Sequence, residues 1–384
     1  MLLVKAQEIV LASFPVPDNR ETVPVPAADG RVLAGPVRSD RTCPPVRLGG
    51  PDGIAVKSTE TSGAGESTPI EVEARRVNTG MPVPEEYDAV IAIEEVTPVL
   101  ENRYRIHTAV SPFQNTIPPG SDAKKGDPVF ASGHILTPLD LGALLTYGIS
   151  QVEVKKWTVG LIATGDEIVS PDTTPVPDQI VDSNTTVFSA FLKQAGIIPV
   201  VYPIVPDNRA AIAEAVRKAT GECDMVLVFG GSSAGSKDFT VDALEECGDL
   251  LFHGVAMGPG KPATFARVAG KPAVGMPGPS VSSLAVFHEL VRPLLVQWGV
   301  PVPPDMLVRG VLARSVPPMG GFDVFMMVTV EKKGDTTVIA PVPRGFGQMM
   351  CVRADAVLHR AAGSPARSEG DEVEVRRLRV ITDL

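Results

Sequence analysis

Five carboxylates stand where the predicted strands of one region end and the following loops begin. They are Asp166, Glu167, Asp207, Asp238 and Asp242. The same loops contain glycine, serine and threonine, whose small side chains let backbone amides approach an anion closely. Carboxylates grouped beside a phosphate could hold a hydrated Mg²⁺ ion. The residue types therefore predict a phosphate-binding site with a magnesium ion.

Four loops carry these groups. They are 163–169 (ATGDEIV), 230–239 (GGSSAGSKDF), 257–262 (MGPGKP) and 276–283 (MPGPSVSS). Their polar side chains include Thr164, Ser232, Ser233 and Ser280. Lys261, held between Gly260 and Pro262, would present a fixed positive charge to an anion. None of the loops has a P-loop or a complete GxGxxG motif, which disfavours a nucleoside triphosphatase and a Rossmann dehydrogenase.

Each of these residues also has a purely structural interpretation. Asp207 and Asp238 precede predicted helices and could cap them, and Asp242 could be a solvated helix residue. Lys261 could be an ordinary surface lysine. Glycine and serine shape any tight strand–helix turn, so one loop alone would not predict a ligand. Four such loops at one end of a sheet make a binding role the stronger interpretation.

The elements between residues 155 and 302 would bring these loops together. Short apolar runs predict strands at 157–165, 197–205, 224–231, 249–257, 262–268 and 272–278. Amphipathic segments predict helices at 184–196, 206–219, 238–247 and 279–295, with Asn184, Asp207 and Asp238 as expected caps. This alternation is typical of a doubly wound α/β domain, in which ligands bind outside the carboxyl ends of the strands.

The flanking regions have a different pattern. Short valine-rich segments and frequent prolines predict mostly β structure, with helical patterns only at 3–14, around 24–32 and at 138–147. From about residue 303 onwards we expect a small β domain, with a hairpin at Lys333–Gly334–Asp335.

Composition excludes several classes of protein. A chain of 384 residues is longer than one core usually serves, which predicts several domains. The net charge of −10 and the few tyrosines and tryptophans disfavour nucleic acid and anionic membranes as partners. The four cysteines are widely spaced, which predicts reduced thiols rather than a zinc site or disulfides. No apolar run could cross a bilayer and no signal peptide is evident, so we expect a cytoplasmic protein.

The four loops, in this order, resemble the MoeA and gephyrin E-domain family, the molybdopterin molybdenumtransferases. The resemblance runs over essentially the whole chain. Its motifs in the α/β region are TGDE at 164–167, DSN at 182–184, VPD at 205–207, GGSSAG at 230–235 and PGKP at 259–262. Further motifs are DGIAV at 52–56, NTGMPVP at 78–84, LTPLDLGALLTYGI at 136–149 and ADAVLHRAAG at 354–363.

The resemblance implies an elongated homodimer of four-domain subunits. The expected domains are a linker domain (1–40 with 133–154), a β-rich insertion (41–132), a MogA-like α/β molybdopterin-binding domain (155–302) and a C-terminal β domain (303–384). The implied cleft combines the α/β domain of one subunit with the insertion of the other. The implied reaction takes adenylylated molybdopterin and molybdate, uses Mg²⁺ and releases AMP, and other proteins of cofactor biosynthesis could be partners.

Site residues follow from motif position. The resemblance implies catalytic roles for Asp52, Glu167, Asp238 and Lys261, and metal binding by Asp122, Asp207, Asp238 and Asp242. Ligand contacts are expected from Thr79, Gly80, Thr164, Gly230, Gly231, Ser232, Ser233, Gly235, Pro277, Gly278 and Ser280. By residue type alone, Asp52 and Thr79 are better explained as turn residues, and only the resemblance favours a functional role for them.

The chain departs from the family mainly in its basic residues. Gly258 stands where the family usually has a lysine, and Ile117, Pro118 and Pro119 stand where it usually has arginines. The family's carboxylates are retained in this chain more fully than its basic residues, which favours metal and adenylate binding over capture of an oxyanion. Two alternatives therefore stand beside the transferase: a diverged paralogue that binds a pterin or nucleotide without efficient metal insertion, and an enzyme that uses tungstate.

Overall fold

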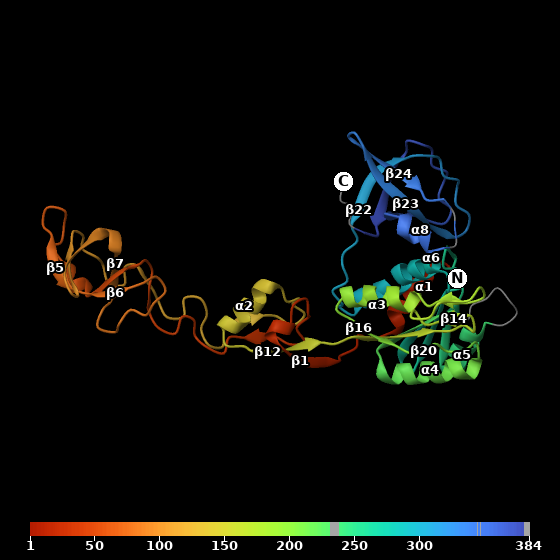
Figure 1. The fold of residues 1–384 in the computed structure, drawn as a ribbon, viewed down its shortest axis with the longest axis horizontal. Coiled ribbons are helices and arrows are strands. Elements are labelled where there is room, and N and C mark those ends of the chain that lie inside the picture. Colours follow the sequence, from red (N-terminus) through yellow and green to blue (C-terminus); the bar gives the residue numbers. More distant parts are fainter. Residues whose placement is uncertain (231–237, 344, 346, 380–384) are drawn as a thin grey trace. The chain divides into compact units, whose positions relative to one another are not determined.

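A computed structural model describes residues 1–230, 238–343, 345 and 347–379 (Figure 1). The chain forms two compact units, Arg20–Lys155 and a larger unit of Met1–Asn19 with Lys156–Leu384. The division into two units does not test the boundaries predicted for the four domains, which stay predictions. No helix in the described ranges has the length and apolar character needed to span a bilayer.

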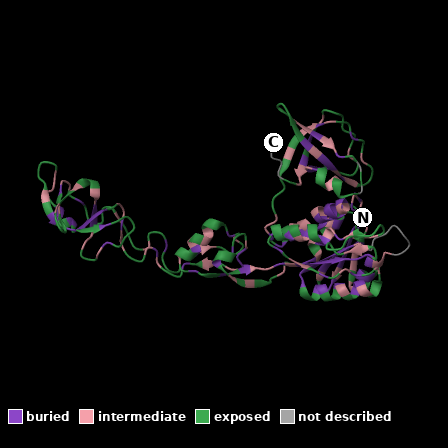
Figure 2. Cartoon of the chain, viewed as in Figure 1, coloured by how far each residue is buried: buried purple, intermediate pink, exposed green. Residues whose placement is uncertain are grey.

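A six-stranded sheet forms the centre of the larger unit. Its order is β16 (Ile198–Val201), β13 (Thr158–Ala163), β17 (Met225–Phe229), β21 (Lys271–Met276), β20 (Thr264–Val268) and β18 (Asp249–His253). The first four strands are parallel, and β20 and β18 continue the sheet in antiparallel pairing. All five residues of β17 are buried, and buried strands fill the middle of this domain in Figure 2.

Helices cover both faces of this sheet. On one face, α4 (Arg209–Glu222) and α5 (Phe239–Cys247) pack Ile212, Val216 and Leu244 against Val228 of β17 (Figure 1). On the other face, Phe188 of α3 (Asn184–Gln194) stacks on Phe229 with ring centroids 5.0 Å apart. The predicted doubly wound α/β domain is confirmed.

A helical segment with three parts closes this domain. It consists of α6 (Ser280–Val286), the π-helix η4 (Phe287–Val291) and α7 (Arg292–Gln297). The N-terminal helix α1 (Leu3–Ser13) packs against η4 and α7, and the side chain of Gln297 donates a hydrogen bond to the carbonyl of Leu11. The helix predicted at 3–14 is therefore present and belongs to the larger unit.

Two predicted helix caps are wrong. Asn208, not Asp207, caps α4, and its Oδ1 accepts a hydrogen bond from the amide of Ala211 at 3.1 Å. The carboxylate of Asp207 instead accepts from Thr164, so it is not available to the helix. Asn184 is the first residue of α3 rather than its cap.

Asp182 takes over part of the capping of α3. Its Oδ1 accepts a hydrogen bond from the amide of Thr185 at 3.1 Å, and its Oδ2 accepts from the hydroxyl of Thr185 at 2.5 Å. The cap predicted for α5 is confirmed, because Oδ1 of Asp238 accepts from the amide of Val241 at 3.1 Å.

The C-terminal strands form a closed β domain. They are β22 (Leu307–Leu312), β23 (Asp323–Lys333), β24 (Thr336–Pro341), β25 (Ala356–Arg360) and β26 (Glu372–Arg377). The pairings β23–β24, β24–β22, β22–β26, β26–β25 and β25–β23 return to the first strand, so this barrel has no open edge between them. The hairpin predicted around Gly334 is present, and Gly334 has a φ of 61°.

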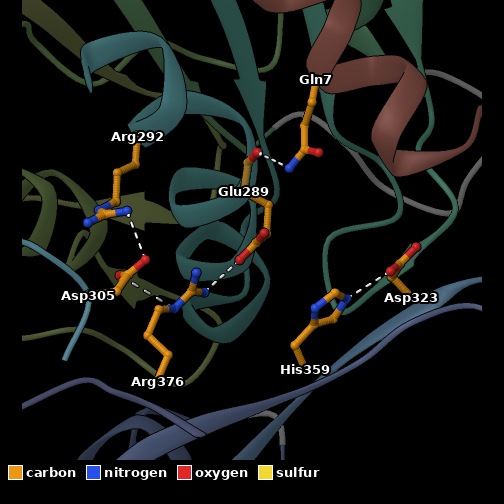
Figure 3. A network of polar contacts seen from close by, with 7 residues as sticks. All are labelled: Gln7, Glu289, Arg292, Asp305, Asp323, His359 and Arg376. Atoms are coloured by element: carbon orange, nitrogen blue, oxygen red, sulfur yellow. Dashed lines mark hydrogen bonds and ion pairs between the residues drawn. The ribbon is translucent and has the colours of Figure 1, made fainter. Parts of the chain in front are cut away.

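Polar contacts join this barrel to the helices of the α/β domain (Figure 3). Nη2 of Arg376 lies 2.6 Å from Oε1 of Glu289, and the two side chains are only 19% and 12% exposed. Arg292 donates to Asp305 at 3.2 Å, and Gln7 of α1 donates to the carbonyl of Glu289 at 3.0 Å. The barrel residue Arg376 thus completes a charge pair that begins on η4.

The π-helix also contains a half-buried histidine whose ring nitrogens are both buried. Neither ring nitrogen of His288 has a hydrogen-bond partner among the described residues, and both are buried. Burial first, and then the positive charges of Arg376 and Arg292, lower the pKa of His288 to about 3. The folded protein therefore holds this imidazole in its neutral form.

We expect acid to destabilise the protein through His288. The folded pKa is depressed, so the unfolded chain binds the extra proton and the free energy of unfolding falls as pH drops from about 6.5 towards 3. The slope is about 1.4 kcal/mol per pH unit in that window. The variant His288→Phe should lose this component in urea titrations between pH 7 and pH 4.5.

A matched control is His253→Asn, which replaces an exposed histidine of the same unit. It should retain the slope of the wild type, because His288 is unchanged. Identical slopes for His288→Phe and the wild type would contradict the assignment.

The smaller unit is mostly β, as predicted. One three-stranded sheet contains β4 (Gly53–Val56), β6 (Arg75–Val77) and β7 (Ala89–Ala92), and a second contains β5 (Ile70–Glu73), β8 (Val96–Leu100) and β9 (Arg103–Ile106). Short pairs are β1 (Arg20–Pro24) with β12 (Gln151–Lys155), β2 (Val37–Arg38) with β11 (Pro128–Phe130), and β3 (Leu48–Gly49) with β10 (Thr116–Ile117). Short 3-10 turns lie at η2 (Ser58–Thr61) and η3 (Ile93–Glu95).

One helix of this unit is confirmed and one is wrong. The predicted helix at 138–147 is α2 (Pro138–Thr146), with a capping box between Thr137 and Asp140. The helix predicted around 24–32 is only a 3-10 turn, η1 (Val25–Ala27). Gly30 has a φ of 70°, outside the helical region, and its amide donates to the carbonyl of Leu136 at 2.8 Å, so the backbone leaves the helical path after one turn.

Candidate active site

A cavity of about 440 Å³ lies at the carboxyl ends of β13 and β17. Apolar side chains form part of its wall, from Ile168 of β14 (Ile168–Val169), from Ile180 of β15 (Ile180–Val181) and from Phe229. The polar part of the wall comprises Thr164, Glu167, Asp182, Ser183, Asn184, Ser280 and Gln348. An apolar surface with a few convergent polar groups is typical of a small-molecule site.

The loop after β13 holds three of the predicted polar residues. Thr164 is 2% exposed, and its hydroxyl donates to Oδ1 of Asp207 at 3.2 Å. The amide of Asp207 in turn donates to Oδ1 of Asp166 at 3.1 Å. The structure therefore brings Thr164, Asp166 and Asp207 together, as the sequence predicted for the carboxyl ends of neighbouring strands.

Glu167 is the carboxylate with the greatest freedom in this cavity. Its side chain is exposed, lines the cavity and makes no hydrogen bond to another side chain or backbone group in the described part of the chain. Its carbonyl accepts from the amide of Ile180, which fixes the backbone at the cavity wall. The backbone of Glu167 is thus fixed while its carboxylate is exposed to the cavity, an arrangement that suits a residue that contacts a ligand.

Position 230 requires glycine, because the backbone there lies very close to the backbone of the loop after β13. Gly230 has a φ of +105°, and a Cβ at this position would lie 2.2 Å from the carbonyl oxygen of Thr164. Only glycine fits between these loops. The other predicted ligand-binding residues of this loop, Gly231, Ser232, Ser233 and Gly235, lie outside the described residues.

The loop after β21 contributes a second set of contacts. Ser280 donates to Oδ1 of Asn184 at 3.2 Å, and Nδ2 of Asn184 donates to the carbonyl of Gly278 at 2.8 Å. Gly278 and Ser280 line the cavity, as the predicted roles require. Pro277 is not part of the cavity wall, and its carbonyl accepts from the hydroxyl of Ser283.

The carboxylates predicted to bind metal are dispersed in this unit. Asp238 caps α5, and Asp242 is exposed on the first turn of the same helix. Over residues 1–230, 238–343, 345 and 347–379, no group of three or more His, Cys, Asp or Glu side chains could hold a metal ion. Mg²⁺ is commonly held by one or two carboxylates with water and substrate phosphates, and Asp207 is compatible with that pattern.

Lys261 and Gly258 flank a second region. Lys261 is exposed in the turn after Gly260. Gly258, in β19 (Met257–Gly258), lines a neighbouring cavity of about 730 Å³ that shares Pro279 with the first cavity. Its wall also contains Arg314 and apolar side chains of the barrel, including Phe322 and Met326. Gly258 adds no charge to this wall where the family usually has a lysine, whereas Arg314 supplies a positive charge to the same cavity.

The smaller unit brings two predicted residues into direct contact. Oδ1 of Asp52 accepts hydrogen bonds from the amide of Thr79 at 2.7 Å and from its hydroxyl at 2.9 Å. These bonds from Thr79, the backbone one first, lower the pKa of the Asp52 carboxyl. Gly80 follows with a φ of 74° and donates its amide to the carbonyl of Gly49 at 2.8 Å. Asp52, Thr79 and Gly80 thus form one ordered turn.

Asp122, predicted to bind metal, has a different neighbour. Its Oδ2 accepts a hydrogen bond from the hydroxyl of Tyr147 at 3.2 Å, and its amide donates to the carbonyl of Cys43 at 3.1 Å. Tyr147 follows α2, so this carboxylate is attached to the helix of its own unit.

Sequence reasoning missed Asp182, Ser183, Asn184 and Gln348 as residues of the cavity wall. The DSN motif at 182–184 contained a signal for the first three, because a polar triplet leads into α3. Gln348 begins the short helix α8 (Gln348–Arg353) of the barrel domain, and no local pattern marks it.

Comparisons with known proteins agree with this arrangement. Residues 2–148 match the family model described as the MoeA N-terminal region (domain I and II), and residues 160–297 match a probable molybdopterin binding domain. The chain is 33% identical to the molybdopterin molybdenumtransferase of Haemophilus influenzae, over 78% of this chain and 80% of that protein. It is 30% identical to molybdopterin molybdenumtransferase 2 of Mycobacterium tuberculosis, over 83% of this chain and 85% of that protein.

A solved structure is similar over nearly the full length. It is the molybdopterin biosynthesis MoeA protein from Pyrococcus horikosii, with a TM-score of 0.84, 28% identity, and coverage of 99% of this chain and 100% of that chain. Both the N-terminal region and the α/β domain thus match the same family. The chain belongs to the MoeA family of molybdopterin molybdenumtransferases.

Proposed function

We propose that this protein inserts molybdenum from molybdate into adenylylated molybdopterin and releases AMP. The observation that carries the proposal is the 440 Å³ cavity, which combines an apolar wall, amide and hydroxyl groups and the exposed carboxylate of Glu167. A heterocycle suits the apolar and amide groups, and a carboxylate suits the activation of water beside a phosphate.

In this proposal the residues have separate roles. Glu167 accepts a proton from the water that attacks the adenylate phosphorus, and Lys261 offsets the charge of an oxyanion. Asp207, with substrate oxygens and water, would hold Mg²⁺, which when bound offsets the charge of the phosphate. Asp238, Asp242 and Asp122 remain candidates for the same ion.

A direct assay tests this function. The purified chain is incubated with adenylylated molybdopterin, Mg²⁺ and molybdate, and AMP release and formation of the metal dithiolene are followed together. We expect both products. Tight binding without AMP release would overturn the proposal in favour of a binding protein, and faster turnover with tungstate than with molybdate would change the substrate.

Restoring a lysine at position 258 should improve molybdate use. The nearest atom to a Cβ at Gly258 is Cε2 of Phe322 at 3.6 Å, so the backbone tolerates a side chain there. One charge-assisted contact is worth about 1.5 to 3 kcal/mol, so Gly258→Lys should lower the KM for molybdate about tenfold or more. The measurement is the molybdate dependence of dithiolene formation.

The control for that variant is Gly258→Met, which has a similar length without the charge. It should leave the KM for molybdate unchanged or raise it. An equal improvement in both variants would mean that filling the cavity, and not charge, is responsible.

We also propose that the protein acts as a homodimer whose sites combine the α/β domain of one subunit with the insertion of the other. Support comes from the family, and from the ordered contact between Asp52 and Thr79, two residues for which the family resemblance implies functional roles. Analytical ultracentrifugation should give a dimer mass.

Mixed dimers provide the sharper test of this arrangement. Co-expression of Asp52→Ala and Glu167→Gln subunits would place both changes in one site of the heterodimer and leave the other site intact. Random pairing should then restore about a quarter of the wild-type activity. Activity no higher than that of either parent would contradict a shared site.

We place this reaction in the cytoplasm. The four cysteines, Cys43, Cys223, Cys247 and Cys351, are all free thiols, which suits a reducing compartment. Burial raises the pKa of the Cys223, Cys247 and Cys351 thiols, so these groups are structural rather than reactive. Other proteins of cofactor biosynthesis are the expected source of the pterin substrate.

A further inference from the structure

A single side chain of the barrel domain reaches two loops of the candidate active site. Nε2 of Gln348 donates hydrogen bonds to Oγ of Ser183 at 2.8 Å and to Oγ of Ser280 at 2.6 Å. Ser183 immediately precedes α3, and Ser280 begins α6, beside which α8 packs (Figure 1). One amide group thus joins segments that are far apart in the sequence.

The contacts continue from these hydroxyls into the cavity wall. Ser280 donates to Oδ1 of Asn184, and the amide of Asn184 donates to the carbonyl of Gly278 at 2.8 Å. Ser183, Asn184, Gly278, Ser280 and Gln348 all line the same cavity. Moving Gln348 would therefore remove two of the four hydrogen bonds that connect these groups on one side of the cavity.

The same amide is not needed to hold the barrel in place. The Arg376–Glu289 pair and the Arg292–Asp305 pair already join this region of the chain to the α/β domain. Gln348 is exposed, so its hydrogen bonds compete with water and each makes only the modest net contribution of an ordinary hydrogen bond, which is enough to order two loops but small against the ion pairs that hold the barrel. The two hydrogen bonds donated by the Gln348 amide are therefore better explained by a role in shaping the cavity wall than by a role in stabilising the fold.

We propose that Gln348 is a positioning residue, through which the barrel domain sets the geometry of the substrate cavity. This proposal rests on the proposed function. Gln348 helps to hold the loop 182–184 and the loop 278–280 at a fixed separation, so that Asn184 and Ser280 present their polar groups to the heterocyclic part of the substrate. Glu167 lies on a different loop and does not depend on these bonds.

The consequence for catalysis is a specific kinetic pattern. Loosening the two loops should weaken substrate binding while the carboxylate that activates water stays in place. Gln348→Met, which keeps the length of the side chain and removes both donors, should raise the KM for adenylylated molybdopterin about tenfold and leave kcat within about twofold.

Three further variants separate positioning from other effects. Gln348→Glu keeps the shape of the side chain, but its carboxylate cannot donate a hydrogen bond. Its KM for adenylylated molybdopterin should therefore equal or exceed that of Gln348→Met. Ser280→Ala added to Gln348→Met should raise KM by less than the product of the two single effects, because both changes remove the same bond. Met349→Ala, at an exposed position of the same helix, is the matched control and should behave like the wild type.

Hydrogen exchange tests the positioning without any substrate. In the full chain, amides of 182–187 and 278–284 should exchange faster in Gln348→Met than in the wild type or in Met349→Ala, while the thermal midpoint stays within about 2 °C. Unchanged exchange in these segments would overturn the proposal, as would faster exchange with an unchanged KM.

These outcomes are distinct from failure of the proposed function. Absence of AMP release by the wild-type protein would overturn the transferase assignment. With active wild-type protein, a fall in kcat at constant KM in Gln348→Met would contradict a role in substrate positioning.

Discussion

Replacing Glu167 by glutamine should lower the rate constant for AMP release by a factor of about 10² to 10⁴, the usual contribution of a positioned general base. The side chain is exposed and makes no hydrogen bond in the described part of the chain, so the variant should fold normally. Its amide is similar in shape and cannot accept the proton. Single-turnover AMP release, together with the thermal midpoint, measures both effects.

The matched control is Glu214→Gln, an exposed glutamate of α4 in the same domain. It should leave the rate unchanged. An unchanged rate in Glu167→Gln would exclude this residue as the base.

The second large effect is expected at the pair that joins the barrel to the α/β domain. Arg376→Met leaves the mostly buried carboxylate of Glu289 without its cation, at a cost of about 2 to 4 kcal/mol in the free energy of unfolding. The lower part of the range for a broken buried pair applies because both side chains keep some exposure to water. Urea titration followed by fluorescence of the two tryptophans would measure it.

The second half of this experiment replaces both partners. Arg376→Met combined with Glu289→Leu should recover much of the lost stability, since an apolar pair of similar volume often substitutes for a buried ion pair. The control is Arg309→Met, whose partner is Glu374 on the barrel surface and whose side chain is 75% exposed. It should cost less than about 1 kcal/mol. Equal losses at Arg376 and Arg309 would show that burial of the pair is unimportant.

The sequence predicted those elements whose signals are local. Strand β17 is a continuous apolar run, buried at every residue, and α4 shows its buried face at helical spacing. The hairpin at Gly334 and the cap at Asp238 depend on residues within three positions of each other. Because such signals involve only near neighbours, they predicted the doubly wound domain and its loops.

Where a prediction from the sequence was wrong, a contact with another segment of the chain had replaced the expected local interaction. Asp207 and Asn208 are both good capping residues, and the hydroxyl of Thr164, from a different strand, engages Asp207 and leaves Asn208 to cap α4. Around residue 25 the apolar spacing favours a helix, but Gly30 has a φ of 70° and its amide donates to the carbonyl of Leu136, which ends the helical turn. In each case an interaction outside the pattern outweighed it.

By itself, the sequence determined the family, the layered α/β domain and the residue types of the candidate site, since these follow from periodicity and from motifs of a few residues. Only the tertiary structure decided that Asp52 meets Thr79, that Asp122 meets Tyr147 and that Gln348 joins the cavity wall. These contacts link segments separated by long stretches of chain. Their existence depends on how the strands and helices pack, because loop closure and side-chain packing are set by the whole fold and not by neighbouring residues.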